Sequence, residues 1–337
     1  MITQIIRKEI IQSKEIIEYS MKNDFLEVRF LNVGGAITKI ALAADDYDEN
    51  LVLSYQNLGD YLTNECFLNM IVGRTANRIT NGKFMLDEKE VQVDINHPPH
   101  HLHGGAQHLG IAFFDVVATG KGYSLHTTLP HQDNGYPGNL NVTVYYELIE
   151  NKLNITYKAL TDQTTIVNLT QHAYFNLSGN LQRSINDHEL TIKALKIAEV
   201  DETSGFTKNQ IPVADTCFDF NIPTIINPEN KRRHYVFNYT NGYDHLYFLD
   251  ASWKVPVEFK DPHSGRTLKI TTTEPAMQFY AGNHLTDELL FENNRSGEKN
   301  LGACFETHKV PFDFESQVLE VGDVYTHITT FEFSVKK

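Results

Sequence analysis

The sequence predicts an all-β protein built as an antiparallel sandwich or barrel. Short stretches rich in Val, Ile, Thr, Tyr and Phe follow one another along the 337 residues, separated by turn residues such as Gly, Asn, Asp and Pro. Long segments with the period of an amphipathic helix are almost missing, and no repeat of fixed length occurs. Because no segment has the composition of a linker, we expect one large β domain over residues 1–337.

The expected elements follow in chain order. Residues 4–18 contain paired isoleucines whose spacing fits neither a strand nor a helix, so both remain open. Residues 25–33 and 36–42 are predicted strands joined by a turn at Gly34 and Gly35. Further hairpin turns are predicted at residues 87–88, 120–122, 150–152 and 261–266. One or two helical turns are expected within residues 57–64, and loops at residues 201–212, 227–240 and 291–300.

Composition excludes several classes of partner. Lys plus Arg number 29 and Asp plus Glu number 43, which gives a net charge of −14 and disfavours nucleic acid and anionic membranes. No apolar run approaches the ~20 residues of a membrane span. The charged N-terminal segment lacks the apolar stretch of a secretory signal, so we expect a cytoplasmic protein. The three cysteines lie far apart and predict neither a disulfide framework nor a zinc ribbon, and Cys304 is expected to be a small buried apolar residue.

Residues 168–177, with the sequence NLTQHAYFNL, place a histidine in the middle of a predicted strand. In an extended chain the side chains of Thr170, His172 and Tyr174 share one face. A rigid strand is a suitable place to aim an imidazole for proton transfer. The pattern alone also fits a structural histidine whose hydrogen bonds are satisfied.

Polar side chains gather in five other segments, namely residues 73–79, 100–105, 242–249, 274–283 and 303–311. Each segment mixes a few polar groups with aromatic or small residues, a composition typical of a sugar or small-molecule pocket. Glu306 lies in an apolar run and is a candidate base or a salt-bridge partner. Asp244 and His245 fit a turn cap or a ligand contact. Gln278 and Asn283 fit hydroxyl binding or the satisfaction of loop backbone groups.

The segment HHLHGG invites a metal interpretation, but no HExxH, CxxC or Asp-rich loop is present to complete a coordination sphere, and we expect no metal. His100 and His101 are expected in an exposed loop, whereas the glycines after His103 allow a ligand to approach closely. Arg74 and Arg78 flank Asn77 and could bind a carboxylate, a phosphate or neighbouring hydroxyls. A structural role in a loop is equally compatible with Arg74. Because no glycine-rich nucleotide motif occurs, no cofactor is expected.

Together these segments resemble the aldose 1-epimerase (galactose mutarotase) family. The matching pieces occur in the family's order and run from about Gly34 to the final TFEFSV strand; they are GRTANRI with NGKF, LHGG, DNGYPGNL, NLTQHAYFNLSG, QIPVADTCFDF, GYDHLYFL, EPAMQFYAGN and FETHKVP. The resemblance implies a large antiparallel β-sandwich of the galactose mutarotase type. It also implies cofactor-free interconversion of the α and β anomers of a free aldose, with a small-molecule sugar as partner and a monomer or homodimer as the active form.

Carried over residue by residue, the resemblance makes Glu306 the base, His172 the general acid and His103 a second active-site histidine. The implied sugar-binding residues are Arg78, Asn77, Asp244 and Gln278. Opening a pyranose requires removal of the proton on the C1 hydroxyl while the ring oxygen gains one, so a carboxylate and an imidazolium must act together. Alternatives are an epimerase of a phosphorylated hexose, which needs further cationic residues in the pocket, and a sugar-binding protein without activity.

The sequence departs from the family pattern near the expected rim of the pocket. The stretch AQHLGIAFF follows LHGG in place of a segment leading to a Trp, and the single Trp is Trp253. His308 stands where a Gln is common, Leu246 where an Asn is common, and residues 129–132 replace a Ser-Pro-Asp-Gly entry. These departures concern the identity of the sugar more than the acid and the base.

Overall fold

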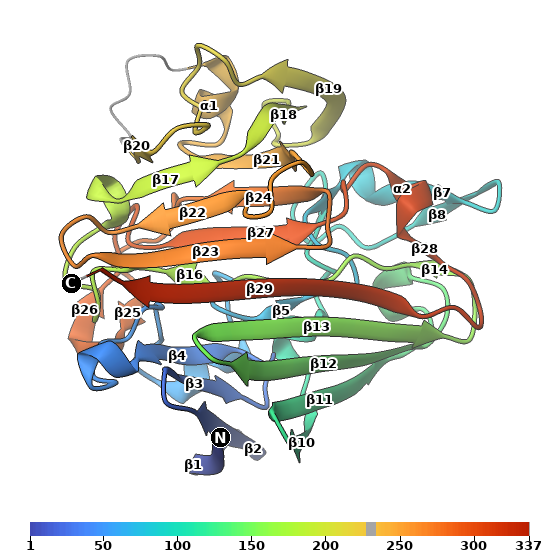
Figure 1. The fold of residues 1–337 in the computed structure, drawn as a ribbon. Helices are drawn as coiled ribbons and strands as arrows, with labels where there is room; N and C mark the ends of the chain where they lie inside the picture. Colours follow the sequence, from blue (N-terminus) through green and yellow to red (C-terminus); the bar gives the residue numbers. More distant parts are fainter. Residues whose placement is uncertain (227–233, 337) are drawn as a thin grey trace.

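Three antiparallel sheets account for most of the strands in this computed structural model, which describes residues 1–226 and 234–336 (Figure 1). The nine-stranded sheet has the order β10 (Asp115–Thr119), β11 (Gly122–Leu129), β12 (Leu140–Ile149), β13 (Lys152–Thr161), β29 (Tyr325–Val335), β23 (Arg266–Thr272), β22 (Val257–Lys260), β17 (Glu189–Ile192) and β20 (Thr224–Ile225). The six-stranded sheet has the order β16 (Tyr174–Phe175), β27 (Ala303–His308), β24 (Ala276–Tyr280), β21 (Asp244–Leu249), β18 (Ala194–Val200) and β19 (Phe206–Pro212). The four-stranded sheet contains β1 (Ile2–Ile11), β2 (Lys14–Lys22), β3 (Leu26–Leu31) and β4 (Ile37–Leu42).

Shorter elements complete the described chain. Two-stranded pairs are formed by β14 (Thr165–Ile166) with β28 (Val318–Leu319), β15 (Thr170–Gln171) with β5 (Ile71–Val72), β6 (Arg78–Ile79) with β9 (His101–Leu102), β7 (Lys83–Leu86) with β8 (Lys89–Gln92), and β25 (Leu290–Phe291) with β26 (Arg295–Ser296). Among the described residues, α-helix is confined to α1 (Tyr235–Tyr239) and α2 (Phe314–Gln317). Single turns of 3-10 helix lie at Ala43–Asp45, Leu58–Leu62, Thr80–Gly82, Leu109–Ile111, Asp133–Gly135, Ile185–Asp187 and Glu292–Asn294. No helix in this part of the chain is long and apolar enough to cross a membrane.

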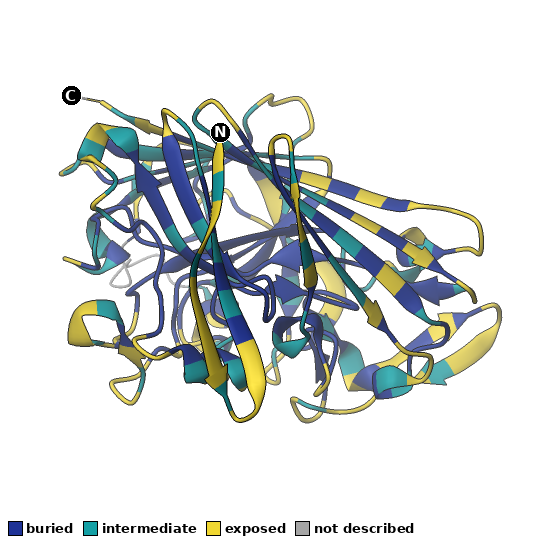
Figure 2. Ribbon diagram, turned by 90° about the horizontal axis from the view of Figure 1, so that it is seen from below, coloured by how far each residue is buried: buried dark blue, intermediate teal, exposed yellow. Residues whose placement is uncertain are grey.

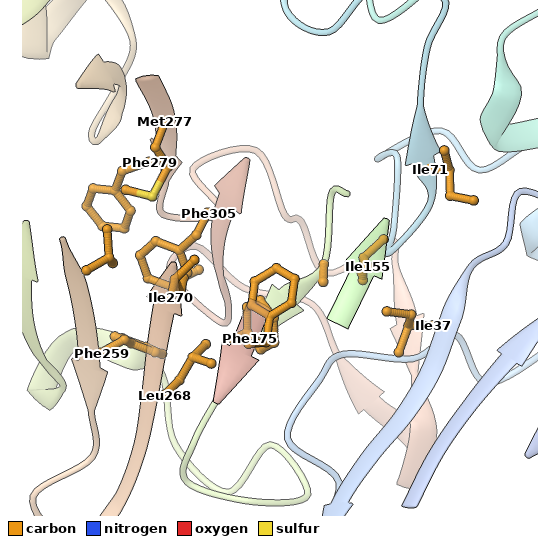
Figure 3. Packing of buried hydrophobic residues seen from close by; sticks show 14 of the residues in the cluster. Ile37, Ile71, Ile155, Phe175, Phe259, Leu268, Ile270, Met277, Phe279 and Phe305 are labelled. Carbon is orange, nitrogen blue, oxygen red and sulfur yellow. The ribbon is translucent and has the colours of Figure 1, made fainter. Parts of the chain in front are cut away.

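The nine-stranded and six-stranded sheets pack face to face, which confirms the predicted sandwich. Figure 2 shows dark-blue and lighter residues alternating along the long strands, as in β12, where every second residue is buried. Between the layers, the ring of Phe305 in β27 lies 5.2 Å from that of Phe259 in β22 of the other sheet, and it also lies 5.6 Å from the ring of Phe279 on the neighbouring strand β24 (Figure 3). Each fully buried side chain of this size stabilises the fold by about 1.5–3 kcal/mol relative to an exposed one, so this core holds the two sheets in a fixed relation.

Most predicted turns are found where the sequence places them. Hairpins join β3 to β4, β7 to β8, β10 to β11, β12 to β13 and β22 to β23. Residues 4–18, left open between strand and helix, form most of the β1–β2 hairpin, and the expected helical turn within residues 57–64 is Leu58–Leu62.

Two loop predictions need correction. The loop expected at residues 201–212 ends in a strand, because β19 pairs with β18. Residues 291–300 include the short β26 beside a 3-10 turn. The third predicted loop, residues 227–240, is described only from residue 234 onward, and there α1 (Tyr235–Tyr239) stands in place of loop; residues 227–233 lie outside the described residues.

Candidate active site

His172 lies at a break between two short strands. Thr170 and Gln171 pair with β5, whereas Tyr174 and Phe175 pair with β27. The continuous strand predicted for residues 168–177 is therefore wrong, because the chain passes from one sheet to another at this point. The His172 backbone is nevertheless held on both sides, since its N–H donates to Met70 O at 2.9 Å and its carbonyl accepts from Asn69 N at 3.1 Å.

Glu306 faces the imidazole of His172. It lies in β27, and its Oε1 atom is 3.5 Å from His172 Nε2. Both side chains are buried, with residue exposures of 2% for Glu306 and 4% for His172. Within the described part of the chain, Glu306 Oε2 has no hydrogen-bond partner. A buried carboxyl with a free oxygen is costly unless a ligand or solvent completes its hydrogen bonds.

Burial sets the proton affinities of this pair. It raises the pKa of the Glu306 carboxyl well above its usual value; the Asp244 carboxylate adds to the rise and Arg78 opposes it. Burial lowers the pKa of His172 to about 4. Both shifts favour the uncharged forms, a protonated Glu306 and a neutral His172, over the carboxylate and imidazolium expected from the sequence. The two states contain the same number of protons and differ only in which group holds one of them.

His103 and Asn77 meet through a local backbone arrangement. Both have a positive φ, 52° and 65°, and the Asn77 N–H donates to His103 Nδ1 at 3.2 Å. The residue after His103 must be glycine, because a Cβ on Gly104 would lie 2.0 Å from Gly73 O. Burial lowers the pKa of His103 well below its usual value. The ring is therefore neutral, and since Nδ1 accepts a hydrogen bond, Nε2 carries the proton.

A chain of hydrogen bonds links the remaining predicted binding residues. Gln278 lies directly opposite Glu306 in the β24–β27 pairing. Asn77 Nδ2 donates to Gln278 Oε1 at 2.9 Å, and Gln278 Nε2 donates to Asp244 Oδ1 at 2.6 Å. Arg78 Nη2 lies 3.8 Å from Asp244 Oδ2. Such a network fixes the side chains that could receive sugar hydroxyls.

All seven predicted site residues line one cavity of about 380 Å³. The structure adds residues that the sequence interpretation missed, namely Glu65, Cys66, Phe67, His97, Leu102, Tyr174, Ser204, Tyr239, Thr240, Tyr280 and His284. The sequence already places Tyr174 on the same face as His172 without assigning it to the site, and Tyr280 could have been found because it is two residues from Gln278. Phe67 and Glu65 lie in an irregular segment without a recognisable motif.

Other candidates have structural roles. His100 and His101, expected in an exposed loop, are buried because β9 packs into the fold, and His101 Nε2 lies 2.8 Å from the Tyr136 hydroxyl. The Arg74 guanidinium is buried and donates to Pro137 O at 2.7 Å and Gly138 O at 3.0 Å. Asn283 donates to Thr240 O and Tyr243 O.

The donor chemistry of the site does not fit a metal ion. Ligand atoms of His103, His172 and Glu306 lie within 4.8 Å of one another. A histidine that binds a metal through Nε2 donates its Nδ1–H to a neighbour. His103 has the opposite arrangement, since its Nδ1 accepts from Asn77. A second cluster, Asp187, His188 and Asp261, is occupied by Arg183, whose Nη2 contacts both Asp261 oxygens at 2.8 and 2.9 Å.

The fold and this cavity define a class of protein. A β-sandwich holds a buried carboxyl 3.5 Å from a buried imidazole, beside aromatic rings and a hydrogen-bonded row of polar side chains, an arrangement suited to an enzyme that transfers protons on a hydroxylated small molecule.

Comparison with known proteins specifies the family. The family model described as Aldose 1-epimerase matches residues 18–332. The chain is 35% identical to the galactose mutarotase of Homo sapiens over 328 residues, which is 94% of each chain. It is 31% identical to the aldose 1-epimerase of Haemophilus influenzae, covering 77% of this chain and 76% of the other. The crystal structure of galactose 1-epimerase from Lactobacillus acidophilus superposes with a TM-score of 0.89 at 27% identity, covering 99% of both chains.

This chain belongs to the aldose 1-epimerase family. It is an isomerase that interconverts the anomers of an aldose, and the predicted β-sandwich of the galactose mutarotase type is confirmed.

Proposed function

We propose that the chain interconverts the α and β anomers of a free hexose such as galactose or glucose, with Glu306 as the base and His172 as the acid. The observation that carries this proposal is the 3.5 Å separation of Glu306 Oε1 and His172 Nε2, two buried groups that line the same cavity. The names of the relatives, galactose mutarotase and aldose 1-epimerase, support the choice of sugar and reaction.

The reaction needs only proton transfers and one bond rotation. Glu306 takes the proton of the C1 hydroxyl while His172 gives a proton to the ring oxygen, the bond between C1 and the ring oxygen breaks, and an open-chain aldehyde forms. After rotation about the C1–C2 bond, the carbonyl presents its other face. The hydroxyl that was the ring oxygen attacks C1 and returns its proton to His172, while Glu306 returns a proton to O1.

The proton affinities of the pair suit this cycle. The cyclic sugar reacts with ionised Glu306 and protonated His172, and the open-chain sugar lies beside protonated Glu306 and neutral His172. Burial of the two groups favours the second distribution. A bound hydroxyl that donates to the Glu306 carboxylate, together with Arg78, would favour the first. A bound hydroxyl and Arg78 therefore oppose the effect of burial on the Glu306 carboxyl, so that both ring opening and ring closure can proceed.

The other site residues have positioning roles in this proposal. His103 presents an Nε2–H donor to a sugar oxygen, because its Nδ1 accepts from Asn77. Gln278, Asp244 and Arg78 form a hydrogen-bonded row that receives neighbouring hydroxyls. Aromatic rings such as those of Tyr174 and Tyr280 offer apolar surface to the C–H faces of the sugar.

A phosphorylated hexose fits this cavity less well than a neutral one. Arg78 already faces the Asp244 carboxylate, and Arg74 is directed into backbone carbonyls away from the cavity. A phosphate would also meet the carboxyl groups of Glu65, Asp244 and Glu306, which line the cavity.

We further propose that the protein works in the cytoplasm as a monomer or homodimer. The cysteines Cys66, Cys217 and Cys304 form no disulfide bonds in the described chain, as is typical of a reducing compartment. One chain supplies every group of the proposed acid–base pair and its hydroxyl-binding row.

Polarimetry of freshly dissolved α-galactose and α-glucose tests the proposal. With the purified protein, both rotations should reach equilibrium much faster than in buffer alone. The variant His172→Asn should lose most of this acceleration while still binding sugar, because the acid is gone and the pocket remains. A folded wild-type protein that equilibrates neither sugar faster than buffer would refute the assignment.

A further inference from the structure

The imidazole of His172 lies between two side chains of a single strand. Cys304 and Glu306 are two residues apart in β27, so both face the same side of the sheet. The Cys304 Sγ atom lies 3.5 Å from His172 Nδ1, and Glu306 Oε1 lies 3.5 Å from His172 Nε2. One strand therefore contacts both nitrogens of the ring.

Cys304 makes a second contact with the same residue. Its Sγ–H donates to the backbone carbonyl of His172 at 4.0 Å. Burial raises the pKa of this thiol well above its usual value, so the sulfur keeps its proton. A thiol has one proton, and when that proton points to the carbonyl, the sulfur lone pairs remain for His172 Nδ1. Both contacts are hydrogen bonds together only if Nδ1 carries a proton and donates it to the sulfur.

We infer that Cys304 is a positioning residue for the reaction, which holds His172 in the tautomer with the proton on Nδ1 and so leaves Nε2 as the nitrogen that exchanges protons. The inference rests on the proposed role of His172 as the acid. Because Nδ1–H stays bonded to sulfur throughout, a proton can pass between Nε2 and the sugar and return without any change at Nδ1. In the opposite tautomer Nε2 already carries a proton, so the neutral ring could not accept one from the sugar at that nitrogen.

The chemistry of sulfur suits this task. A carboxylate beside Nδ1 would stabilise the imidazolium and make His172 a weaker acid. An uncharged thiol is a weak acceptor that orients the ring with little effect on its proton affinity. Two further contacts keep the ring in place, since its centroid lies 5.0 Å from that of Tyr174 and 5.4 Å from that of His103.

Nitrogen NMR of the wild-type protein tests the inference directly. The ring ¹⁵N shifts of His172, assigned by comparison with His172→Asn, should show a protonated Nδ1 and an unprotonated Nε2 at neutral pH. A wild-type ring with its proton on Nε2 overturns the inference. This measurement does not depend on activity. If the wild-type protein did not catalyse mutarotation, the proposed function would be refuted, but the NMR spectrum would still show which nitrogen of His172 carries the proton.

Variants give the kinetic counterpart. Cys304→Ala removes one hydrogen bond to the ring and should lower kcat about tenfold with KM changed less than about twofold, while the His172 signals show a mixture of tautomers. Cys304→Ser keeps a hydroxyl that can donate and accept, and should restore part of kcat. Cys217→Ala is the matched control, because Cys217, like Cys304, is a buried cysteine that does not line the cavity, but it does not belong to β27. Equal losses of kcat in Cys304→Ala and Cys217→Ala, or wild-type kcat in Cys304→Ala, would overturn the inference.

Discussion

The two faces of β27 are equally buried and chemically opposite. On one face, Cys304, Glu306 and His308 alternate with core residues, and among the described residues neither Glu306 Oε2 nor His308 Nε2 has a hydrogen-bond partner. On the other face, Phe305 packs against the rings of Phe259 and Phe279, and Thr307 Oγ1 lies 2.6 Å from Thr329 Oγ1. Burial alone therefore does not distinguish reactive groups from supporting ones. Within β27, the side-chain atoms without hydrogen-bond partners lie on the first face only.

The largest expected effect is a loss of activity on substitution of Glu306, which lies with Cys304 and His308 on the face of β27 that we call the cavity face. Glu306→Gln removes the base, so kcat should fall about 10³-fold, while stability stays the same or rises because a buried carboxyl with one unpartnered oxygen is removed. Polarimetry and thermal unfolding of the same preparation measure both quantities. Undiminished turnover in a folded Glu306→Gln protein would contradict the role of this residue.

Substitution of Phe305, on the opposite face of β27, should lower stability and leave activity nearly unchanged. Phe305→Ala leaves a cavity between the two sheets and should reduce the free energy of unfolding by about 3–5 kcal/mol. In conditions where the variant is folded, its kcat should stay within a few-fold of wild type, since no atom of the acid–base pair is changed. Phe305→Leu is the matched control and should lose less stability. A stable but inactive Phe305→Ala protein would show that the two faces are not separable.

His308 allows a pH test of the cavity face. Burial lowers its pKa from 6.5 to about 4, so the unfolded chain binds a proton here before the folded chain does. As pH falls from 6.5 to about 4, the wild type should therefore lose about 1.4 kcal/mol of stability per pH unit through this residue. His308→Gln should remove that part of the slope in urea unfolding measured across this pH range. An unchanged slope would mean that His308 titrates normally in the folded protein.

The smallest expected effect concerns the hydroxyl-binding row. Asp244→Asn removes the charge that faces Arg78 and alters the hydrogen bond from Gln278, so KM should rise about tenfold with a smaller change in kcat. The loss of a negative charge also lowers the pKa of Glu306. Steady-state polarimetry at several sugar concentrations separates KM from kcat. Asp250→Asn is the control and should leave both constants unchanged, because Asp250 is a half-buried residue just beyond β21 that does not line the cavity.

The sequence was informative where local rules decide the structure. Hairpin turns such as Asp87-Glu88 have fixed chemistry and were located correctly. Polar motifs far apart in the chain could be grouped through their resemblance to a family, and all seven named residues do line one cavity.

Tertiary context decided the rest. His172 was expected within one strand, but its two flanks pair with different partners. His101 was assigned to an exposed loop because nothing local shows that Tyr136 covers it. Cys304 was treated as an apolar filler, since its proximity to His172 depends on the pairing of β16 with β27.

The position of β29 has a consequence for how this protein folds during its synthesis. This strand comes near the end of the sequence, yet it lies between β13 and β23 in the nine-stranded sheet (Figure 1). During translation, β13 and β23 emerge long before the strand that joins them, and each exposes a free edge that can pair with another nascent chain. We expect a product that stops before Tyr325 to aggregate rather than to fold with reduced activity.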